Sequence, residues 1–152
     1  MIVCSGSLHA AETVLGSVEE VMLLPSGILL PARIDTGAAL TSLDARNIRI
    51  VDGHAEFDLP SPSGIHHLRL PLVRETAKKV RTPAGRDERP IVRLTLCIGE
   101  RQLRIRATLA DRTAMDYPLL IGRNVLKKDM VVNVSKSHLQ RPRCIAGKSR
   151  EK

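Results

Sequence analysis

The sequence is almost devoid of aromatic side chains. It has one Tyr, one Phe and no Trp among 152 residues, so a hydrophobic core must be built from Leu, Ile and Val, and the β-branched members of that set favour strands. The same shortage weighs against binding of single-stranded nucleic acid, which depends on bases stacking on aromatic rings. No hydrophobic run approaches the ~20 residues of a membrane-spanning helix. We therefore expect a β-rich protein with no membrane span, and the shortage of aromatics disfavours nucleic acid as its partner.

Cysteines are also few, and their spacing is uninformative. Cys4, Cys97 and Cys144 show no CxxC pattern and do not make a disulfide framework. The start, MIVCSGSLHAAET, ends like a secretory signal but lacks a charged first region and a full apolar region. Residues 1–12 are interpreted as a flexible segment of a cytoplasmic protein or as a signal-peptide remnant of an exported, periplasmic one. In the second case Cys97 and Cys144 would remain and could pair.

Positive charge is in excess. The formal net charge is +8, and between Arg69 and Arg112 ten Arg and two Lys stand against five acids. A basic field of this size favours an acidic partner, whether nucleic acid, anionic lipid or an acidic peptide. A solvated surface that keeps the chain soluble explains the same charges equally well.

Short strands separated by turn residues dominate the sequence. Three hairpins are predicted, over residues 13–35, 54–73 and 91–110, with turns at Pro25-Ser26-Gly27, Pro60 to Gly64 and Gly99-Glu100-Arg101. In the third hairpin apolar residues alternate with arginines, so one face is predicted to be buried and the other wet.

The remaining segments complete a single domain. The polar segment 74–90 is either a long surface loop or a mobile hairpin. Residues 118–134 predict an apolar run, a short helix near 123–128 and a closing strand. We expect one domain over residues 13–139, followed by a basic disordered tail over residues 140–152.

Two short stretches carry the chemistry. In ARIDTGAALTSL an apolar strand ends in Asp35-Thr36-Gly37, where glycine suits either a positive φ or the close approach of another backbone. Alone, this tripeptide is expected by chance in roughly a few per cent of chains of this length. In YPLLIGRNVL an apolar run meets Gly122, which would let that segment pass beside the Asp35 loop without a side chain in the way.

Together these stretches resemble the retropepsin-like aspartic proteases, in which a strand ending in DTGA is paired with a later IIGRN segment. The resemblance runs from about Val18 to Val134. Within the family the sequence is most similar to a bacterial RimB-like subgroup, often labelled "ATP-dependent zinc protease", through DERPIV and ATLADRTAMDYPLLIGR. It implies an all-β, retropepsin-like closed β-barrel, with one lobe per chain and one short C-terminal helix.

The residues themselves do not support the zinc and ATP of that label. No HExxH or other ligand spacing exists among the histidines and cysteines, and the chain has no GxxxxGK[ST] loop. The histidines are His9, His54, His66, His67 and His138. We expect no metal and no cofactor.

The resemblance implies that Asp35 is half of a catalytic carboxyl pair. In aspartic proteases generally, two carboxyls about 3 Å apart share one proton, so that one deprotonates water while the other polarises the substrate carbonyl. Because this chain has a single Asp-Thr-Gly, the second Asp35 must come from a second copy in a homodimer. By similarity, Thr36 bonds across the two-fold axis and Gly37 orients the water through its backbone.

The same similarity assigns the surrounding residues. Ala38 and Ala39 would line the substrate groove, and the segment 74–90 would be a flap that closes over it. Thr82, Gly85 and Arg86 would lie at the flap tip, and Ile121, Gly122 and Asn124 would support the site from below. Arg123 is predicted either to contact substrate or to brace the fold, with Asp111 or a substrate carboxylate as its partner.

Two functions follow as alternatives. The first is a homodimeric aspartic endopeptidase that cleaves acidic or glutamate-rich peptides; members of the subgroup are associated with enzymes that add glutamate tails, which suggests trimming of such tails. The second is a dimer of the same fold that binds acidic peptides without cutting them. Nucleic-acid binding rests on charge alone and would show a steep dependence on salt.

Overall fold

The computed structural model describes residues 12–73, 78–82 and 85–145. Within them, strands dominate and a single short helix is present. The elements are β1 (Thr13–Leu15), β2 (Val18–Leu24), β3 (Ile28–Ile34), β4 (Thr41–Asp44), β5 (Arg46–Val51), β6 (His54–Ser61), β7 (Gly64–Pro71), β8 (Lys78–Thr82), β9 (Gly85–Arg89), β10 (Ile91–Ile98), β11 (Arg101–Ala110), β12 (Leu119–Ile121), α1 (Arg123–Leu126) and β13 (Met130–Val132).

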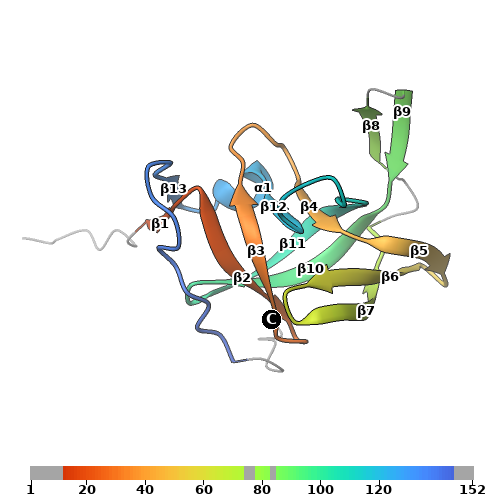
Figure 1. Ribbon diagram of the computed structural model, residues 1–152, viewed down its shortest axis with the longest axis horizontal. Coiled ribbons are helices and arrows are strands. Elements are labelled where there is room, and N and C mark those ends of the chain that lie inside the picture. The colour runs from red at the N-terminus through yellow and green to blue at the C-terminus, as the bar shows by residue number, and fades with distance from the viewer. Residues whose placement is uncertain (1–11, 74–77, 83–84, 146–152) are drawn as a thin grey trace, which may run out of the picture.

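Six strands close into a barrel in the order β10-β11-β4-β12-β3-β2 (Figure 1). Two predicted hairpins, β2–β3 and β10–β11, supply four of them, and their turns include Gly27 and Gly99 at positive φ of 79° and 57°. The strand β12 runs parallel to β3 and antiparallel to β4. The strand β12 therefore lies between β3, which leads into the Asp35 loop, and β4, which follows that loop. The predicted all-β closed barrel is confirmed.

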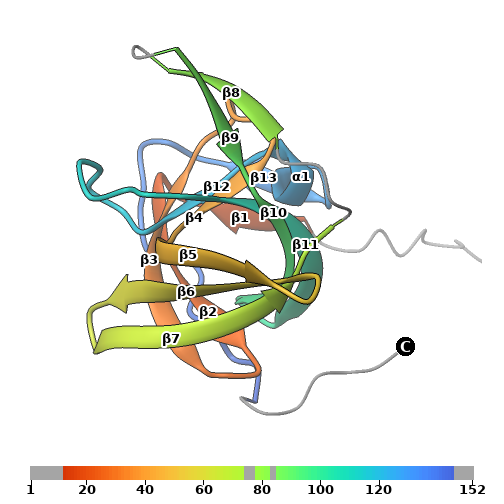
Figure 2. The same ribbon diagram turned by 90° about the vertical axis from the view of Figure 1, so that its right-hand side faces the viewer.

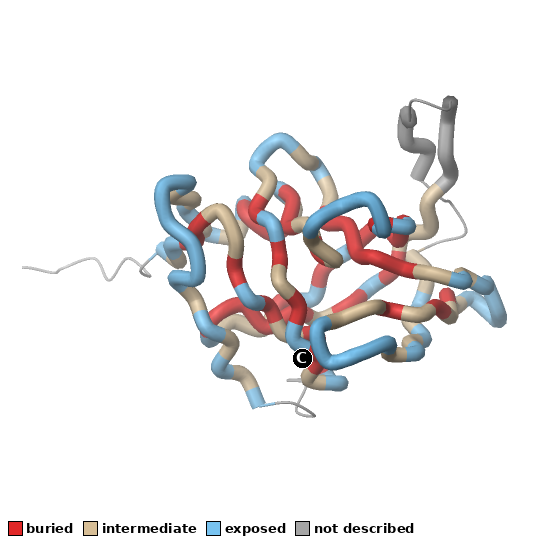
Figure 3. The backbone as a smooth tube through the Cα atoms, viewed as in Figure 1, coloured by how far each residue is buried: buried red, intermediate tan, exposed pale blue. Residues whose placement is uncertain are grey.

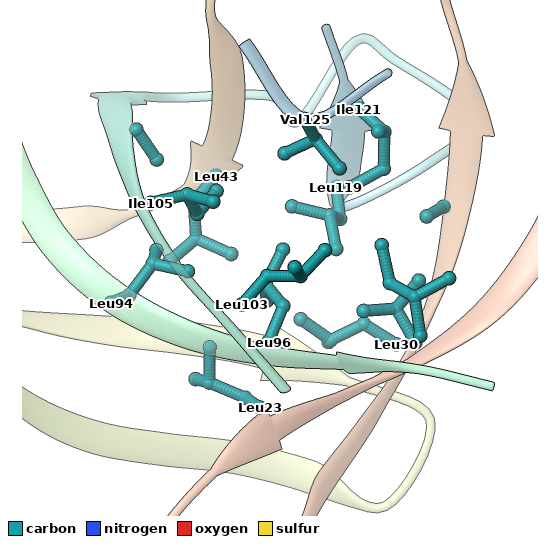
Figure 4. Close-up of a cluster of buried hydrophobic side chains, with 14 of the residues drawn as sticks. Leu23, Leu30, Leu43, Leu94, Leu96, Leu103, Ile105, Leu119, Ile121 and Val125 are labelled. Carbon is teal, nitrogen blue, oxygen red and sulfur yellow. The ribbon is translucent and has the colours of Figure 1, made fainter. Parts of the chain in front are cut away.

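Aliphatic side chains fill the barrel, as the shortage of aromatics requires. Figure 4 shows Leu94 and Leu96 of β10 among the buried side chains of the opposite strands, and the register places them opposite Ile105 and Leu103 of β11. The arginines between these residues are exposed, namely Arg93, Arg104 and Arg106. The predicted alternation of a buried and a wet face in this hairpin is confirmed.

A three-stranded sheet, in the order β5-β6-β7, packs beside the barrel. The middle strand β6 buries Ala55, Phe57 and Leu59 in the core, whereas β7 remains largely at the surface (Figure 3). The hairpin β6–β7 matches the second predicted hairpin. The third strand, β5, was not predicted, because its alternation is interrupted by a register shift between Arg46 and Arg49.

Within the segment 74–90, the described residues 78–82 and 85–89 form two paired strands, which favours the predicted hairpin over a long surface loop. The strands β8 and β9 pair from Lys78 with Arg89 to Thr82 with Gly85. In both views they project from the end of the barrel at which β3 finishes (Figures 1 and 2). The side chains of residues 78–88 lie outside the described part of the structure, and with them those of Thr82 and Arg86.

The chain after β13 returns along the barrel as far as Ile145, where the sequence predicted disorder from Gln140. The carboxylate of Glu19, which is fully buried, accepts hydrogen bonds from the backbone N–H groups of Leu139 at 2.9 Å and Gln140 at 2.6 Å. The N–H of Arg143 then bonds to Gly99 O at 2.7 Å. Composition alone could not reveal this order, because it depends on a carboxylate from the opposite end of the chain. Residues 146–152 lie outside the described part.

A disulfide joins Cys97 of β10 to Cys144 of this returning segment, across a sequence separation of 47. Closing a loop of that length restricts the unfolded chain, and the chain-entropy model gives about 4 kcal/mol of stabilisation. Reduction, or Cys144→Ser, should therefore lower the free energy of unfolding by about that amount. Guanidinium unfolding with and without reductant measures it, with Cys4→Ser as the control. Equal midpoints in the two conditions would contradict this expectation.

Candidate active site

Asp35 follows directly after β3 and begins a surface loop. Its backbone N–H bonds to Ile121 O at 2.9 Å, which ties the loop to the end of β12. Its carboxylate is half-buried, and Oδ1 accepts a hydrogen bond from the N–H of Gly37 at 2.9 Å. The carboxylate is thus held by its own loop and keeps access to solvent.

Gly37 leaves room for the Asp35 carboxylate and does not need a special φ angle. It is absent from the glycines with positive φ in the described residues. A Cβ added to it would lie 3.2 Å from Asp35 Oδ1, tighter than an ordinary contact. Of the two reasons that the sequence suggested, a positive φ does not apply, and the neighbour at Gly37 is the side chain of Asp35 and not another backbone.

The segment around Gly122 passes directly beneath the Asp35 loop. The N–H of Arg123 donates to Ala38 O at 2.8 Å, and that of Asn124 donates to Ala39 O at 3.2 Å. A Cβ on Gly122 would lie 2.6 Å from Leu40 C and 2.7 Å from Leu40 O. These are backbone atoms that cannot rotate away, so only glycine fits, as the sequence predicted.

The segment from β12 to α1, which passes beneath the Asp35 loop, is called the β12–α1 crossing. It is held by the hydroxyl of Thr41, a buried residue, and by the side-chain amide of Asn124. Asn124 Oδ1 accepts hydrogen bonds from both the N–H and the hydroxyl of Thr41, each at 2.9 Å, and its Nδ2 donates to Arg106 O at 2.8 Å. The N–H of Gly122 in turn donates to Thr41 Oγ1 at 3.2 Å. Asn124 was predicted to support the site, but Thr41 was missed. The sequence feature that could have pointed to Thr41 is a hydroxyl residue at the first position of β4, the buried strand that follows the Asp35 loop.

Arg123 braces the loop through a backbone oxygen. Its Nη1 donates to Thr36 O at 3.1 Å, whereas Asp111, one of the two partners suggested for it, has other partners. Asp111 accepts instead from the backbone N–H and the hydroxyl of Thr113, and lies 3.7 Å from Arg46 Nε. The hydroxyl bond is the largest cause that lowers the pKa of Asp111. The carboxylate of Asp111 therefore already has hydrogen-bond donors within its own turn.

A buried arginine that the sequence did not single out lies in the segment before β12. Arg112 Nε donates to Tyr117 O at 2.9 Å, and its backbone N–H donates to Asp44 Oδ1 at 2.9 Å. Burial lowers the pKa of Arg112, and the nearby carboxylates of Asp44 and Asp35 oppose that shift. This cation thus lies within electrostatic reach of Asp35.

The remaining predicted site residues fall in two groups. Thr36 and Ala39 are exposed and Ala38 is half-buried, all on the Asp35 loop, and Ile121 is buried beneath it. Thr82, Gly85 and Arg86 belong to the β8–β9 hairpin. Among the described residues, no group of three or more His, Cys, Asp or Glu is placed to hold a metal, and no helix there is long and apolar enough to cross a membrane.

A closed barrel that carries an Asp-Thr-Gly loop on a Gly-Arg-Asn crossing defines one lobe of the acid-protease fold. The chain belongs to the RimB-like family, described as "Retropepsin-like aspartic endopeptidase RimB", whose model matches residues 14–143. This confirms the family that the two motifs suggested. The family and fold give the chain an aspartic-protease-like character.

The chain is similar to three known proteins to different extents. A protein of Parasynechococcus marenigrum (strain WH8102) named "Probable alpha-L-glutamate ligase" is 33% identical over 137 residues, which is 84% of this chain but only 29% of that protein. A structure of Lpg0085 from Legionella pneumophila, described as having unknown function, is 28% identical with a TM-score of 0.73 and covers 85% of this chain and 98% of its own. The EIAV protease complexed with the inhibitor HBY-793 is 14% identical with a TM-score of 0.44, over 72% and 84% of the two chains.

Proposed function

We propose that two copies of this chain form an aspartic endopeptidase in which the two Asp35 carboxyl groups meet in one shared site. The observation that carries the proposal is the Asp35 carboxylate itself. It is held by Gly37 N–H at 2.9 Å on a loop that the β12–α1 crossing fixes from below. A reacting group must be held rigidly and remain accessible, and this carboxylate meets both conditions.

The second carboxyl is assigned to a second copy because nearby acids of the same chain have other roles. Asp44 is buried and bound to Arg112 N–H and to Arg46 Nη2. Asp111 is engaged by Thr113. The Asp35 loop exposes Thr36, Gly37 and Ala39, which gives an isologous partner a surface to pack on.

The proposed chemistry needs no covalent intermediate. One carboxylate of the pair takes a proton from a bound water, whose oxygen attacks the carbonyl carbon of the scissile bond. The other carboxyl, which carries the shared proton, donates a hydrogen bond to the carbonyl oxygen. The tetrahedral intermediate then collapses as the amine leaves with a proton from the pair. The β8–β9 hairpin is proposed to act as the flap that excludes water from this step.

Acidic peptides are the proposed substrates. The net charge of +8 supports this choice. A relative named as a probable α-L-glutamate ligase contains a region similar to this chain. A peptidase that accompanies glutamate addition would remove the added residues by hydrolysing the bonds that join them.

A matched pair of peptides tests this substrate class. We expect a peptide with a run of glutamates to be cleaved with a kcat/KM about tenfold above that of the same peptide carrying glutamines, because opposite charges attract substrate to the cleft. The ratio should fall between about 50 and 500 mM salt, since screening weakens that attraction. Product formation followed by mass spectrometry measures both. Equal cleavage of the two peptides at low salt would remove the acidic preference and leave the peptidase proposal standing.

A further inference from the structure

Three arginines share the outer face of the β10–β11 hairpin. Arg93 of β10 stands directly opposite Arg106 of β11 in the register, and Arg104 lies two residues from Arg106 on the same face. All three are exposed. Side chains directly opposite one another on neighbouring strands have Cβ atoms about 5 Å apart, and alternate residues of one strand lie about 7 Å apart. These three residues therefore gather positive charge on one side of the hairpin, which we call the arginine face.

Acids are missing from the described surroundings of this face. The strands β10 and β11 contain four arginines and no Asp or Glu. On one side, β2 pairs with β10 through Met22, Leu23 and Leu24. On the other side α1, which contains no acid, lies next to β11 (Figure 2), and Lys128 Nζ lies 3.5 Å from Arg104 O. Among the described residues, none of the three guanidinium groups has an ion-pair or hydrogen-bond partner.

In the neighbouring sheet, by contrast, arginines are paired with an acid. Arg49 of β5 and Arg69 of β7 both stand opposite Glu56 of β6 in the register. The carboxylate of Glu56 lies 3.1 Å from Arg49 Nη2 and 3.6 Å from Arg69 Nε. Opposite charges across strands are favourable, whereas like charges directly opposite one another are destabilising. The arginine face therefore costs the free protein some stability, and an acidic ligand would relieve that repulsion.

The spacing of the arginines suits an acidic peptide better than a nucleic acid. In an extended peptide alternate side chains lie on one side about 7 Å apart, which is also the spacing of Arg104 and Arg106 along β11. Stacking of bases needs aromatic rings, and β10 and β11 contain none. A duplex bound through about 6–10 phosphates would need more cations than the three arginines and Lys128 supply.

We propose that the arginine face binds an extended segment of the substrate that is rich in glutamate or aspartate, at a place separate from the scissile bond. Each guanidinium pairs with one carboxylate through two parallel hydrogen bonds. Arg106 is tied to the β12–α1 crossing, because its carbonyl oxygen accepts a hydrogen bond from Asn124 at 2.8 Å. A substrate anchored there is therefore kept at a raised local concentration near the Asp35 loop. This inference rests on the proposed function, since it concerns the substrate of that site.

Binding is measured with a fluorescein-labelled decaglutamate peptide, titrated into the Asp35→Asn chain so that it is not cleaved. We expect saturable binding by fluorescence anisotropy, weakened about tenfold by Arg93→Gln/Arg106→Gln, as for the loss of two exposed ion pairs. The matched control is Arg49→Gln/Arg69→Gln. It removes the same two charges from arginines that Glu56 already holds, and it should leave the affinity within about twofold of its original value.

Stability gives a second readout that does not depend on a ligand. Arg93→Glu places a carboxylate opposite Arg106, so the variant supplies within the sheet the charge that the peptide would bring. We expect its midpoint of urea unfolding to rise while binding of decaglutamate is lost, because a favourable cross-strand pair replaces a repulsive one. Arginines that serve only to brace the hairpin would give the opposite sign, with a lower midpoint.

Cleavage separates this inference from the proposed function. Two substrates share one scissile sequence, and one of them also carries a glutamate tail joined through a Gly-Ser linker. In wild type the tail should lower KM. The ratio of kcat/KM for the tailed over the untailed substrate should fall about tenfold in Arg93→Gln/Arg106→Gln and hold in Arg49→Gln/Arg69→Gln. If wild type cleaves neither substrate but the first double variant still loses peptide binding, the proposed function alone fails.

Three results would overturn the inference. One is an equal loss of affinity in the two double variants, because the net charge alone would then attract the peptide. Another is a lower unfolding midpoint in Arg93→Glu. The third is binding of an RNA duplex, or of vesicles containing phosphatidylserine, that is tighter than binding of decaglutamate and is weakened by Arg93→Gln/Arg106→Gln. In that case a phosphate-bearing partner would occupy the face.

Discussion

Replacing Asp35 by Asn is expected to reduce peptidase activity by about 10³-fold or more, the contribution typical of a general acid or base. The amide has the shape of the carboxyl, and its oxygen still accepts the hydrogen bond that Gly37 N–H gives to Asp35 at 2.9 Å. It cannot, however, take a proton from water. The loop and the fold should therefore survive while the chemistry stops. Steady-state cleavage, a thermal melt and sedimentation on the same samples measure all three properties.

Asp52→Asn is the matched control. Asp52 is an exposed acid in the turn after β5, with a positive φ of 49° that asparagine also tolerates. It should leave activity unchanged. Activity retained in Asp35→Asn would contradict the proposed chemistry. Binding of acidic peptides by a well-formed wild-type dimer that yields no product would instead favour the non-catalytic alternative.

Replacing Gly122 by Ala is expected to destabilise the protein by about 3 kcal/mol, at the upper end of the usual cost of overpacking. The added methyl would lie 2.6 Å from Leu40 C and 3.0 Å from Ala38 O. Relief requires the two segments of the crossing to separate, which would break the bonds that hold Ala38 and Ala39 and move Asp35. We therefore expect kcat/KM to fall as well. Urea unfolding and cleavage assays on the same variant measure both effects.

Gly53→Ala separates crowding from backbone strain. Gly53 has a positive φ of 71°, but a Cβ on it would meet nothing within 4 Å. Its replacement should cost only about 1 kcal/mol, the penalty for a side chain in that backbone region, and should leave cleavage intact. If the two variants lost equal stability, the close approach at Gly122 would not be the cause.

The hairpins could be predicted because their signals are local. Pro25 to Gly27, Pro60 to Gly64 and Gly99 mark the turns, and alternation in the flanking strands sets the buried faces. The crossing at Gly122 was also predictable, because an apolar run into glycine next to an Asp-Thr-Gly strand implies that two backbones pass closely. These features need only a few neighbouring residues to be recognised.

What could not be predicted depends on contacts between distant parts of the chain. Glu19 looks like a surface residue until the backbone of Leu139 and Gln140 folds over it. Thr41 supports the site only through its hydrogen bond to Asn124. That residue lies in the helix α1, which begins at Arg123, 82 positions later in the chain. The pairing of Cys97 with Cys144 was suggested only for an exported chain, because the sequence does not show that the returning segment brings Cys144 to β10. No local pattern encodes such partners.

The sequence predicted the backbone arrangement of the site better than it predicted the contacts of the side chains. The loop from Asp35 to Ala39 and the segment from Ile121 to Asn124 meet as the two motifs implied. Arg123 donates a hydrogen bond to the Thr36 carbonyl oxygen of the Asp35 loop, where the sequence suggested an acid as its partner. The roles proposed for Thr82 and Arg86 rest on the position of the β8–β9 hairpin alone.

Subunit mixing tests the shared site most directly. Wild-type and Asp35→Asn chains are unfolded together in equal amounts, refolded and assayed against wild type at the same total concentration. If each active site needs an Asp35 carboxyl from both copies, random pairing leaves only the wild-type homodimers active, at about one quarter of the wild-type rate. A value of about one half would mean that each chain works alone, and the dyad proposal would be wrong.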